Sequence, residues 1–301
     1  MKKEKIFISL ILGLLTPFSY SSIPLVEGIT AAFNNSLVHS SKQVSDQFIL
    51  KQRENLRKNT KNKDFGPQSP RDIDQNSGKN KYKLKENLVH EKMNLCHIHF
   101  HKNAEHKGGE FTKYAGNGDG YGNNGGYRYS GQLTKQELKS VKSKICPSNH
   151  GSLLSGDTIE VHYVYSKAKR KPSPTSKVCL STLTKKTELF VVAQVYVLVN
   201  DEKAFDFKDF TQVGLKNNFY QVLNFPDKKD IPVQYFGSTT GPTYNEKASP
   251  LQVLWRVYPK VIRVNLKTVG QWCQKNVFGE SHGHGVRNLV TNPDLLSEIK
   301  D

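Results

Sequence analysis

Sulfur-containing residues are scarce, and the chain holds one strongly apolar stretch only, at its N-terminus. Among 301 residues there are four Cys and two Met. No two cysteines are spaced as Cys-x-x-Cys, which argues against a thiolate zinc site and a thioredoxin-type site. A bilayer span needs about 20 apolar residues. The lack of further apolar runs therefore excludes a multi-pass membrane protein.

Acidic residues are outnumbered by basic ones. Lys and Arg total 44 against 27 Asp and Glu, which gives a formal net charge of +17. Hydrophobic residues make up 36% of the chain, enough for a core, so wholesale disorder is excluded. The charge allows weak association with an anionic envelope surface, and a solvated basic tail is the alternative. No nucleic-acid partner is expected, because no recognition motif accompanies the charge.

The first 21 residues have the pattern of a secretory signal peptide. Lysines precede an uncharged run from Ile6 to Leu15, and small residues follow up to Ser21. The run is too short to span a bilayer. We therefore expect an exported protein, periplasmic or secreted, from which residues 1–21 are removed.

The rest of the chain divides by texture. Residues 22–64 are polar and Lys-rich, which indicates a mobile or peripheral segment in which Val44–Arg57 could form a helix. Residues 65–301 form the predicted folded domain. Its β-branched and aromatic segments are Leu95–Phe100, Thr158–Tyr165, Glu188–Val199, Leu251–Tyr258 and Val261–Leu266, with turn residues such as Pro259 between them. Short helical periods occur only at Leu133–Lys142 and Val269–Gln274. This pattern predicts a mainly β (α+β) domain with few helices.

The four cysteines are an even set in a chain expected to reach an oxidising compartment. One or two disulfides are therefore plausible, and free buried thiols are the alternative. Sequence alone does not choose among the three pairings. We favour Cys146 with Cys179, because both flank one predicted strand region.

A Gly-rich stretch at 116–131 contains a GxGxxG match at Gly120, Gly122 and Gly125. No hydrophobic strand precedes the match and no helix follows it, so a dinucleotide site is not indicated. The stretch has no Lys-Ser or Lys-Thr for a P-loop, and its single acid, Asp119, is too few for a calcium loop. We expect a flexible surface loop.

Histidines carry the strongest chemical signal. His97, His99 and His101 alternate with Ile98 and Phe100, so on a strand the three imidazoles share one face. Neighbours two apart are close enough to hold one metal ion, whereas His97 and His101 are too far apart for joint ligation. The pair is therefore 97/99 or 99/101.

A third ligand is expected from the strand TIEVHYVY at 158–165. His162 shares a face with Glu160, and a metal-bound His commonly gives its second N–H to a carboxylate. Three neutral His with one open position suit a catalytic zinc ion that ionises water. His282 and His284, in ESHGHG, form a second and weaker cluster for an accessory metal or proton site.

Several motifs together resemble those of the carbonic anhydrases, nearest the delta class. They are QSPRDID at 68–74, HIHFHKNAEH at 97–106, IEVH at 159–162, GSTTGP at 237–242 and GVRNLV at 285–290. The resemblance implies a central, twisted, mostly antiparallel sheet with a few short peripheral helices. It also implies the reversible hydration of carbon dioxide to bicarbonate and a proton by zinc-bound hydroxide.

The resemblance assigns a role to each matching position. His99, His101 and His162 would bind Zn²⁺, and Glu160 would orient His162. A threonine, Thr240 or by a one-residue shift Thr239, would accept a hydrogen bond from the hydroxide and donate its proton to Glu105. Carbon dioxide would contact an apolar wall of Val164, Val191 and Trp255. No clear match to a proton-shuttle His is found, and the candidates are His106, His97 and His90.

Two rivals remain at this stage. HxHxxxE also begins a cupin motif, in which Glu105 would be a fourth ligand for iron or manganese on a β-barrel. A zinc-binding envelope protein without catalytic activity is the second rival.

Overall fold

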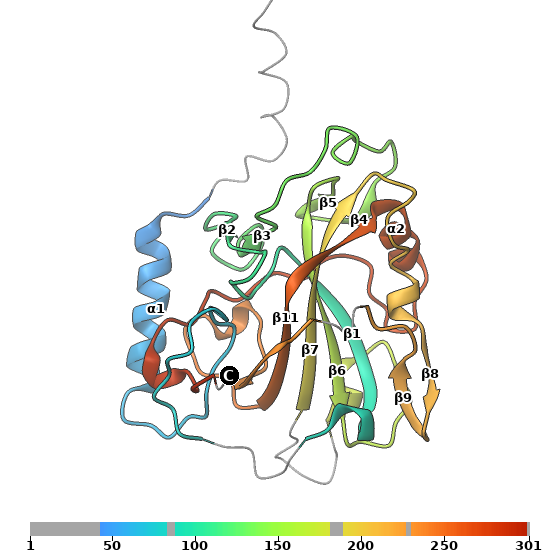
Figure 1. Ribbon diagram of the computed structural model, residues 1–301. Coiled ribbons are helices and arrows are strands. Elements are labelled where there is room, and N and C mark those ends of the chain that lie inside the picture. The colour runs from blue at the N-terminus through green and yellow to red at the C-terminus, as the bar shows by residue number, and fades with distance from the viewer. Residues whose placement is uncertain (1–42, 83–87, 181–188, 227–229, 300–301) are drawn as a thin grey trace, which may run out of the picture. The chain divides into compact units, whose positions relative to one another are not determined.

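Five strands build the central sheet of the computed structural model (Figure 1). They are β1 (Asn94–Lys102), β6 (Thr158–Ser166), β7 (Leu189–Val199), β10 (Val233–Ser238) and β11 (Gln252–Asn265). Their order is β1-β6-β7-β11-β10, and only the β7–β11 pairing is parallel. The predicted sheet-dominated, mostly antiparallel class is confirmed.

The structure describes residues 43–82, 88–180, 189–226 and 230–299. The expected signal peptide and the first half of the polar segment therefore lie outside the described residues. Three two-stranded sheets accompany the central one: β2 (Lys113–Tyr114) with β3 (Tyr127–Arg128), β4 (Ile145–Ser148) with β5 (Gly151–Leu153), and β8 (Val213–Lys216) with β9 (Phe219–Val222). The helices are α1 (Asp46–Thr60), α2 (Leu266–Gln274) and the 3-10 turns η1 (His90–Lys92), η2 (Ser176–Cys179), η3 (Asp209–Thr211), η4 (Pro242–Tyr244) and η5 (Pro293–Leu295).

Both faces of the sheet are covered, because β6 and β7 are buried along their whole length. Side chains alternate between the faces of a strand, so each strand supplies two cores. One core joins Ile98 and Phe100 of β1 to Trp272 of α2. The other contains Val164 of β6 and Trp255 of β11. The histidines at odd positions of β1 lie on the second face.

A single strand, β11, replaces the two strands expected around Pro259. The register shifts between Val257 and Val261, so the strand carries an irregularity where a turn was predicted. The carbonyls there have partners outside the ladder: Pro259 O accepts from Glu110 N at 2.9 Å, and Lys260 O accepts from Gln194 at 2.8 Å. Proline lacks an N–H, so a bulge accommodates it without ending the strand.

Of the two expected short helices, only the one within α2 forms. At 133–142 a turn is present, in which Thr134 N donates to the Glu137 carboxylate at 2.7 Å and Glu137 N donates to the Thr134 hydroxyl at 3.2 Å. Leu138 is 49% exposed, so this segment lacks the buried apolar face that stabilises a surface helix.

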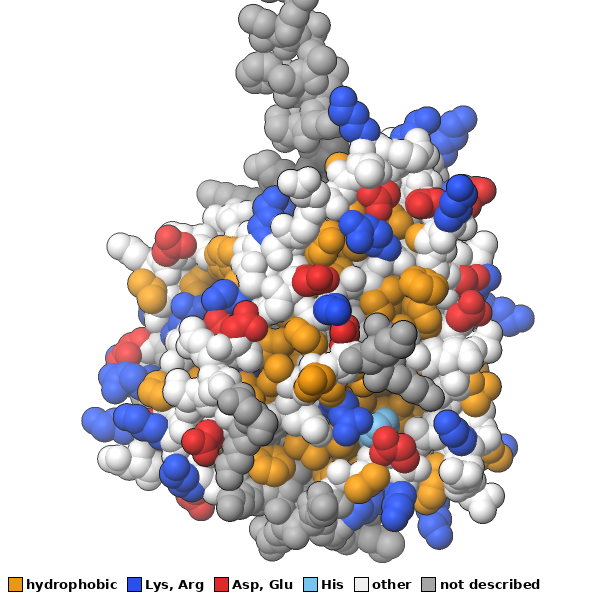
Figure 2. All heavy atoms as spheres, in the orientation of Figure 1, with side chains coloured by type: hydrophobic (Ala, Val, Ile, Leu, Met, Phe, Trp, Pro, Cys, Tyr) orange, Lys and Arg blue, Asp and Glu red, His pale blue; other side chains and the backbone are white. Residues whose placement is uncertain are grey.

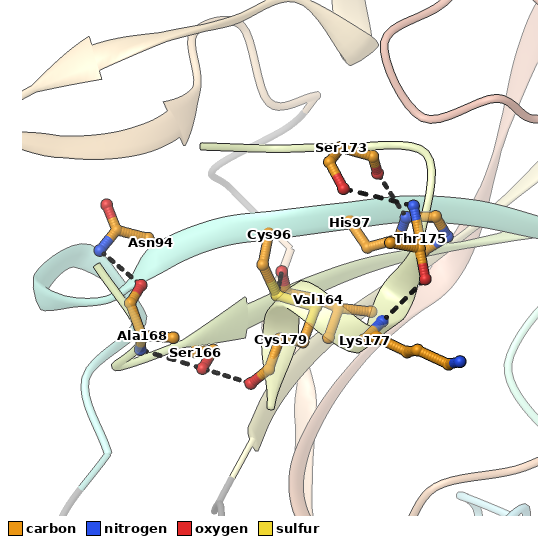
Figure 3. Close-up of a disulfide and its surroundings, with 10 residues drawn as sticks. All are labelled: Asn94, Cys96, His97, Val164, Ser166, Ala168, Ser173, Thr175, Lys177 and Cys179. Carbon is orange, nitrogen blue, oxygen red and sulfur yellow. Dashed lines mark hydrogen bonds between the residues drawn. A yellow bond between two sulfur atoms is a disulfide. The ribbon is translucent and has the colours of Figure 1, made fainter. Parts of the chain in front are cut away.

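The disulfides pair Cys96 with Cys179 and Cys146 with Cys273, so the expected pairing of Cys146 with Cys179 is wrong. Both residues do flank strand β6 in sequence. However, Cys146 belongs to the core that contains α2, whereas Cys179 belongs to the core on the opposite face. Figure 3 shows the Cys96–Cys179 bond joining β1 to the segment that carries η2.

Helix α1 lies within the segment that was expected to be mobile or peripheral. It begins after Ser45, whose side chain caps Phe48 N, and it buries Ile49 and Leu56. Gln52 donates to the carbonyl of Gly120 at 2.9 Å, so the helix holds the Gly-rich stretch in a defined place. The boundary at residue 64 remains a prediction.

Basic side chains do not gather in one patch on the face shown in Figure 2, where Lys and Arg are interspersed with Asp and Glu. Among the described residues, no helix has the length and apolar character needed to cross a membrane.

Candidate metal centre

His99, His101 and His162 come together on one face of two neighbouring strands. His99 of β1 pairs directly with His162 of β6, and His101 follows two residues later on the same face. One ring nitrogen from each lies within 4.8 Å of the other two. Nδ1 of His162 is 3.2 Å from Nε2 of His99. Sequence spacing left 97/99 and 99/101 open, and in the structure His99 and His101 are the pair that groups with His162.

The outward nitrogens of two of these rings are held by acceptors. Nε2 of His162 lies 2.8 Å from Oε1 of Glu160, and Nδ1 of His101 lies 2.8 Å from the carbonyl of Gly285. An acceptor on one nitrogen places the N–H there and leaves the lone pair on the other. Nε2 of His101 is buried and has no hydrogen-bond partner among the described residues. The inner nitrogens thus present lone pairs to a common point.

Burial favours the neutral form of His99 and His101. It lowers the pKa of His101 to about 4, with Glu105 opposing the shift. Burial also lowers the pKa of His99 well below its ordinary value, and the neighbouring His162 and His101 reinforce this. Neutral imidazoles are the form that ligates metal, so His99 and His101 are in the ligating form at neutral pH.

Glu160 collects hydrogen bonds from four directions. Oε2 accepts from the backbone N–H groups of Glu105 at 2.8 Å and His106 at 3.1 Å, and Oε1 contacts His106 Nδ1 at 2.6 Å as well as His162. Burial alone would raise the pKa of Glu160, but the charge and hydrogen bonds of His106 and His162 hold it well below its usual range. Glu160 is therefore an ionised, immobile acceptor.

Two of the three histidines considered as proton shuttles lie outside the cavity that connects the triad to solvent. His106 is fully buried, and its Nε2 lies 2.7 Å from the hydroxyl of Tyr235 while its Nδ1 contacts Glu160. His90 packs against Tyr165 and Phe190, whose side chains belong to the core on the opposite face of the sheet. Only His97 lines the same cavity as the triad.

Glu105 is fixed on one oxygen and unpartnered on the other. Oε1 accepts from the backbone N–H of Arg287 at 2.7 Å. Oε2 is buried without a partner among the described residues and lies 3.8 Å from Nε2 of His101. Sequence reasoning did not single out Arg287, although the motif GVRNLV contains it.

The threonine contact to Glu105 that was expected is absent from the described residues. The hydroxyl of Thr239 is 2.5 Å from that of Ser249, so this side chain is directed elsewhere. Thr240 lies in the wall of the cavity, next to Gly241, whose φ of 120° permits the sharp change of direction before η4. Thr239 lines the same cavity, so what distinguishes the two threonines is the hydrogen bond between Thr239 and Ser249.

The cavity over the triad has a volume of about 610 Å³ and an apolar side. Val164, Val191 and Trp255, which the family resemblance assigns to an apolar wall, line it. Trp255 is anchored by a hydrogen bond from its indole N–H to Ser238 O at 3.0 Å, and its ring contacts that of His162 at a centroid distance of 4.9 Å. An uncharged, apolar molecule is suited to this wall.

Glu280 is a cavity residue that sequence reasoning missed. It lies in the wall with His97 and His284, and its carboxylate contacts both rings. The weak cluster at ESHGHG was its only sequence signal.

Comparison with protein families gives one match. A family model described as delta carbonic anhydrase matches residues 90–268. A comparison with curated proteins finds no match.

Three solved structures are similar, at scores too low to add an argument. An alpha-carbonic anhydrase from Photobacterium profundum is 14% identical, with a TM-score of 0.26 over 75% of this chain and 87% of that one. The alpha-carbonic anhydrase of Thermovibrio ammonificans, in complex with the inhibitor sulfanilamide, is 13% identical, with a TM-score of 0.26 over 74% and 84%. A hyperthermostable carbonic anhydrase from a hydrothermal vent chimney is 13% identical, with a TM-score of 0.26 over 78% and 86%. The family match covers more than half of the chain and includes all three convergent histidines, and the protein therefore belongs to the delta carbonic anhydrase family.

Proposed function

We propose that this protein catalyses the reversible hydration of carbon dioxide to bicarbonate and a proton, with zinc held by His99, His101 and His162. The observation that carries the proposal is the convergence of three imidazoles beside an apolar wall. The unpartnered, buried Nε2 of His101 fits a metal ion, because a buried nitrogen acceptor without a partner is costly. Three His with an open position are a donor set typical of catalytic zinc.

Zinc in such a site supplies hydroxide at neutral pH, because it lowers the pKa of water from 15.7 to about 7. The protein's residues supply position. Glu160 fixes the tautomer of His162, and the carbonyl of Gly285 does the same for His101. Val164, Val191 and Trp255 would receive carbon dioxide, which has no charge and little need of hydrogen bonds.

Thr240 and Glu105 are proposed to orient the attacking oxygen. An ionised carboxylate can only accept, so a threonine that donates to Glu105 keeps its own oxygen free to accept. Oε2 of Glu105 is a buried acceptor that lacks a donor among the described residues, which supports this use. His106 is proposed to position Glu160, with which it makes a 2.6 Å contact, in place of the shuttle role considered from sequence.

The structure argues against the cupin alternative. A cupin would need a β-barrel, whereas the central sheet here is open, with β1 and β10 at its edges. Glu105 is also outside the group of ligand atoms that lie within 4.8 Å of one another. Export remains part of the proposal, supported by two disulfides of the kind that persist in oxidising compartments.

Stopped-flow measurement of carbon dioxide hydration with a pH indicator, together with zinc analysis, tests the proposal. We expect His99→Ala and His162→Ala to lose zinc and activity together. His150→Ala, at an exposed turn, is the matched control and should keep both. Full activity in either ligand variant would refute the site. A wild-type protein that binds zinc but does not hydrate carbon dioxide would support the non-catalytic alternative.

A further inference from the structure

A second cluster of metal-binding side chains lies in the same cavity, outside the triad. Nε2 of His97, on β1, is 3.3 Å from Oε1 of Glu280. Nε2 of His284 is 2.7 Å from the other oxygen of the same carboxylate. The side chains of His97 and Glu280 are 6% and 9% exposed, whereas that of His284 is 45% exposed. Both imidazoles thus contact one carboxylate, through its opposite oxygens, at the edge of the cavity.

Both ring nitrogens of His97 face hydrogen-bond acceptors. Its Nδ1 is 3.4 Å from the carbonyl of Ser173, as Figure 3 shows, and its Nε2 faces the Glu280 carboxylate. Both neighbours are acceptors, but a neutral imidazole carries a single N–H. A cation between Nε2 and the Glu280 carboxylate would leave the single N–H for the carbonyl of Ser173.

The backbones that carry the cluster are firmly held. His284 N donates to Phe100 O at 2.8 Å and Lys102 N donates to His284 O at 3.1 Å, which ties the segment to β1. The side chain of Asn276 holds the backbone of Glu280: Oδ1 accepts from Glu280 N at 3.1 Å, and Nδ2 donates to Glu280 O at 2.6 Å. Such pre-positioning lowers the ordering cost of binding an ion.

We propose that His97, Glu280 and His284 form a second divalent-cation site, distinct from the triad and within the same cavity. Two His nitrogens and one carboxylate oxygen are ligands that Zn²⁺ and Co²⁺ accept. The two nitrogens meet opposite oxygens of Glu280, so a shared ion requires a turn of the half-exposed His284 ring. The ring of His282, 5.8 Å from that of His284, is near enough to be a further donor.

The charge of Glu280 suits a cation. Burial alone would raise its pKa, but the hydrogen bonds and charges of His284 and His97 lower it to about 2, so the carboxylate is ionised at neutral pH. The rings of His97 and His284 lie 5.5 and 5.7 Å from that of His99. A second ion would therefore lie next to the triad.

Calorimetric titration of the metal-stripped protein with ZnCl₂, with metal analysis after dialysis, tests the site. We expect the wild type to bind two zinc ions per chain, one tighter than the other. Glu280→Gln keeps the size of the side chain and removes its charge, and it should weaken the second ion at least about tenfold. Glu91→Gln is the matched control, because exposed Glu91 contacts one His only and should leave two ions bound.

The same titration separates the two sites. His99→Ala should lose the tight ion and keep the weaker one, so failure of the triad and failure of the second site give different results. His284→Ala, at a partly exposed position, repeats the test if Glu280→Gln does not fold. One zinc ion per wild-type chain, or unchanged binding of the second ion in both Glu280→Gln and His284→Ala, would overturn the proposal.

Discussion

Oε1 of Glu160 lies 2.8 Å from Nε2 of His162, two residues further along the same strand. Because an ionised carboxylate only accepts, the N–H of His162 must be on Nε2, and its Nδ1 lone pair points toward His99. We expect Glu160→Gln to weaken zinc binding by about 10- to 100-fold, as loss of such an orienting carboxylate does. Zinc affinity measured against a competing chelator gives the result directly.

Glu160→Gln should also lower the stability of the fold, because Glu160 accepts several hydrogen bonds. A glutamine amide would direct N–H donors at the N–H groups of Glu105 and His106, so we also expect a loss of roughly 1–3 kcal/mol in stability. Unfolding by urea in the presence and absence of zinc separates the two effects. Unchanged zinc affinity in a folded Glu160→Gln variant would contradict the orienting role.

The two threonines of GSTTGP should respond differently to truncation. Both threonines line the cavity, but the hydroxyl of Thr239 is already paired with that of Ser249 at 2.5 Å. We expect Thr240→Ala to slow turnover about 100-fold, the effect of misplacing a reacting group, while zinc stays bound. Thr239→Ala should cost about 1 kcal/mol of stability, one hydrogen bond, with little change in turnover. The opposite pattern in the hydration assay would show that the alignment of this loop is off by one residue.

Local periodicity explains why the triad could be predicted. Two residues separated by one position on a strand share a face whatever the fold, so His99 with His101, and Glu160 with His162, needed no tertiary information. Their meeting depended on the pairing of β1 with β6, and there the family resemblance supplied what spacing did not. Glu280 could not be found in this way, because it reaches His97 from a segment that follows α2, far along the chain.

The wrong disulfide has a related cause. Every residue of β6 is buried, so its sequence carries no sign of which face looks toward Cys146 and which toward Cys179. The two cysteines lie near the same strand in sequence and are separated by the sheet in space. The turn predicted at Pro259 was wrong because proline marks both turns and bulges inside long strands, and the local sequence does not distinguish the two.

The Cys96–Cys179 disulfide is predicted to support the cavity as well as the fold. Cys179 and residues 174–177 line the cavity, and the bond ties this segment to β1 beside His97. Replacing both cysteines by Ala should cost about 2–4 kcal/mol of stability and raise KM. The matched control removes Cys146–Cys273, which lies on the other face: it should cost a similar stability and leave KM unchanged. Equal effects of the two double variants on KM would contradict the prediction.

The pH dependence of stability is predicted to include His90, whose side chain is 17% exposed. Burial lowers its pKa to about 4, helped by Arg256 and opposed by Glu91. The folded pKa lies below the ordinary value of 6.5, so the unfolded chain binds this proton more readily between the two values. The contribution of His90 to the free energy of unfolding is fully present above pH 6.5. It is lost as the pH falls toward 4, by about 3 kcal/mol in total.

Replacing His90 by Phe should remove this pH sensitivity. A phenyl ring can occupy the place beside Tyr165 and Phe190, whose ring centroids lie 5.2 and 5.0 Å from that of His90. Urea unfolding at a series of pH values from 7.5 to 4 should therefore show a shallower decline for His90→Phe than for the wild type, and the gap should open only below about pH 6.5. His150→Ala, which changes an exposed histidine, should follow the wild-type curve. Parallel curves for wild type and His90→Phe would mean that His90 takes up its proton as easily in the folded protein as in the unfolded chain.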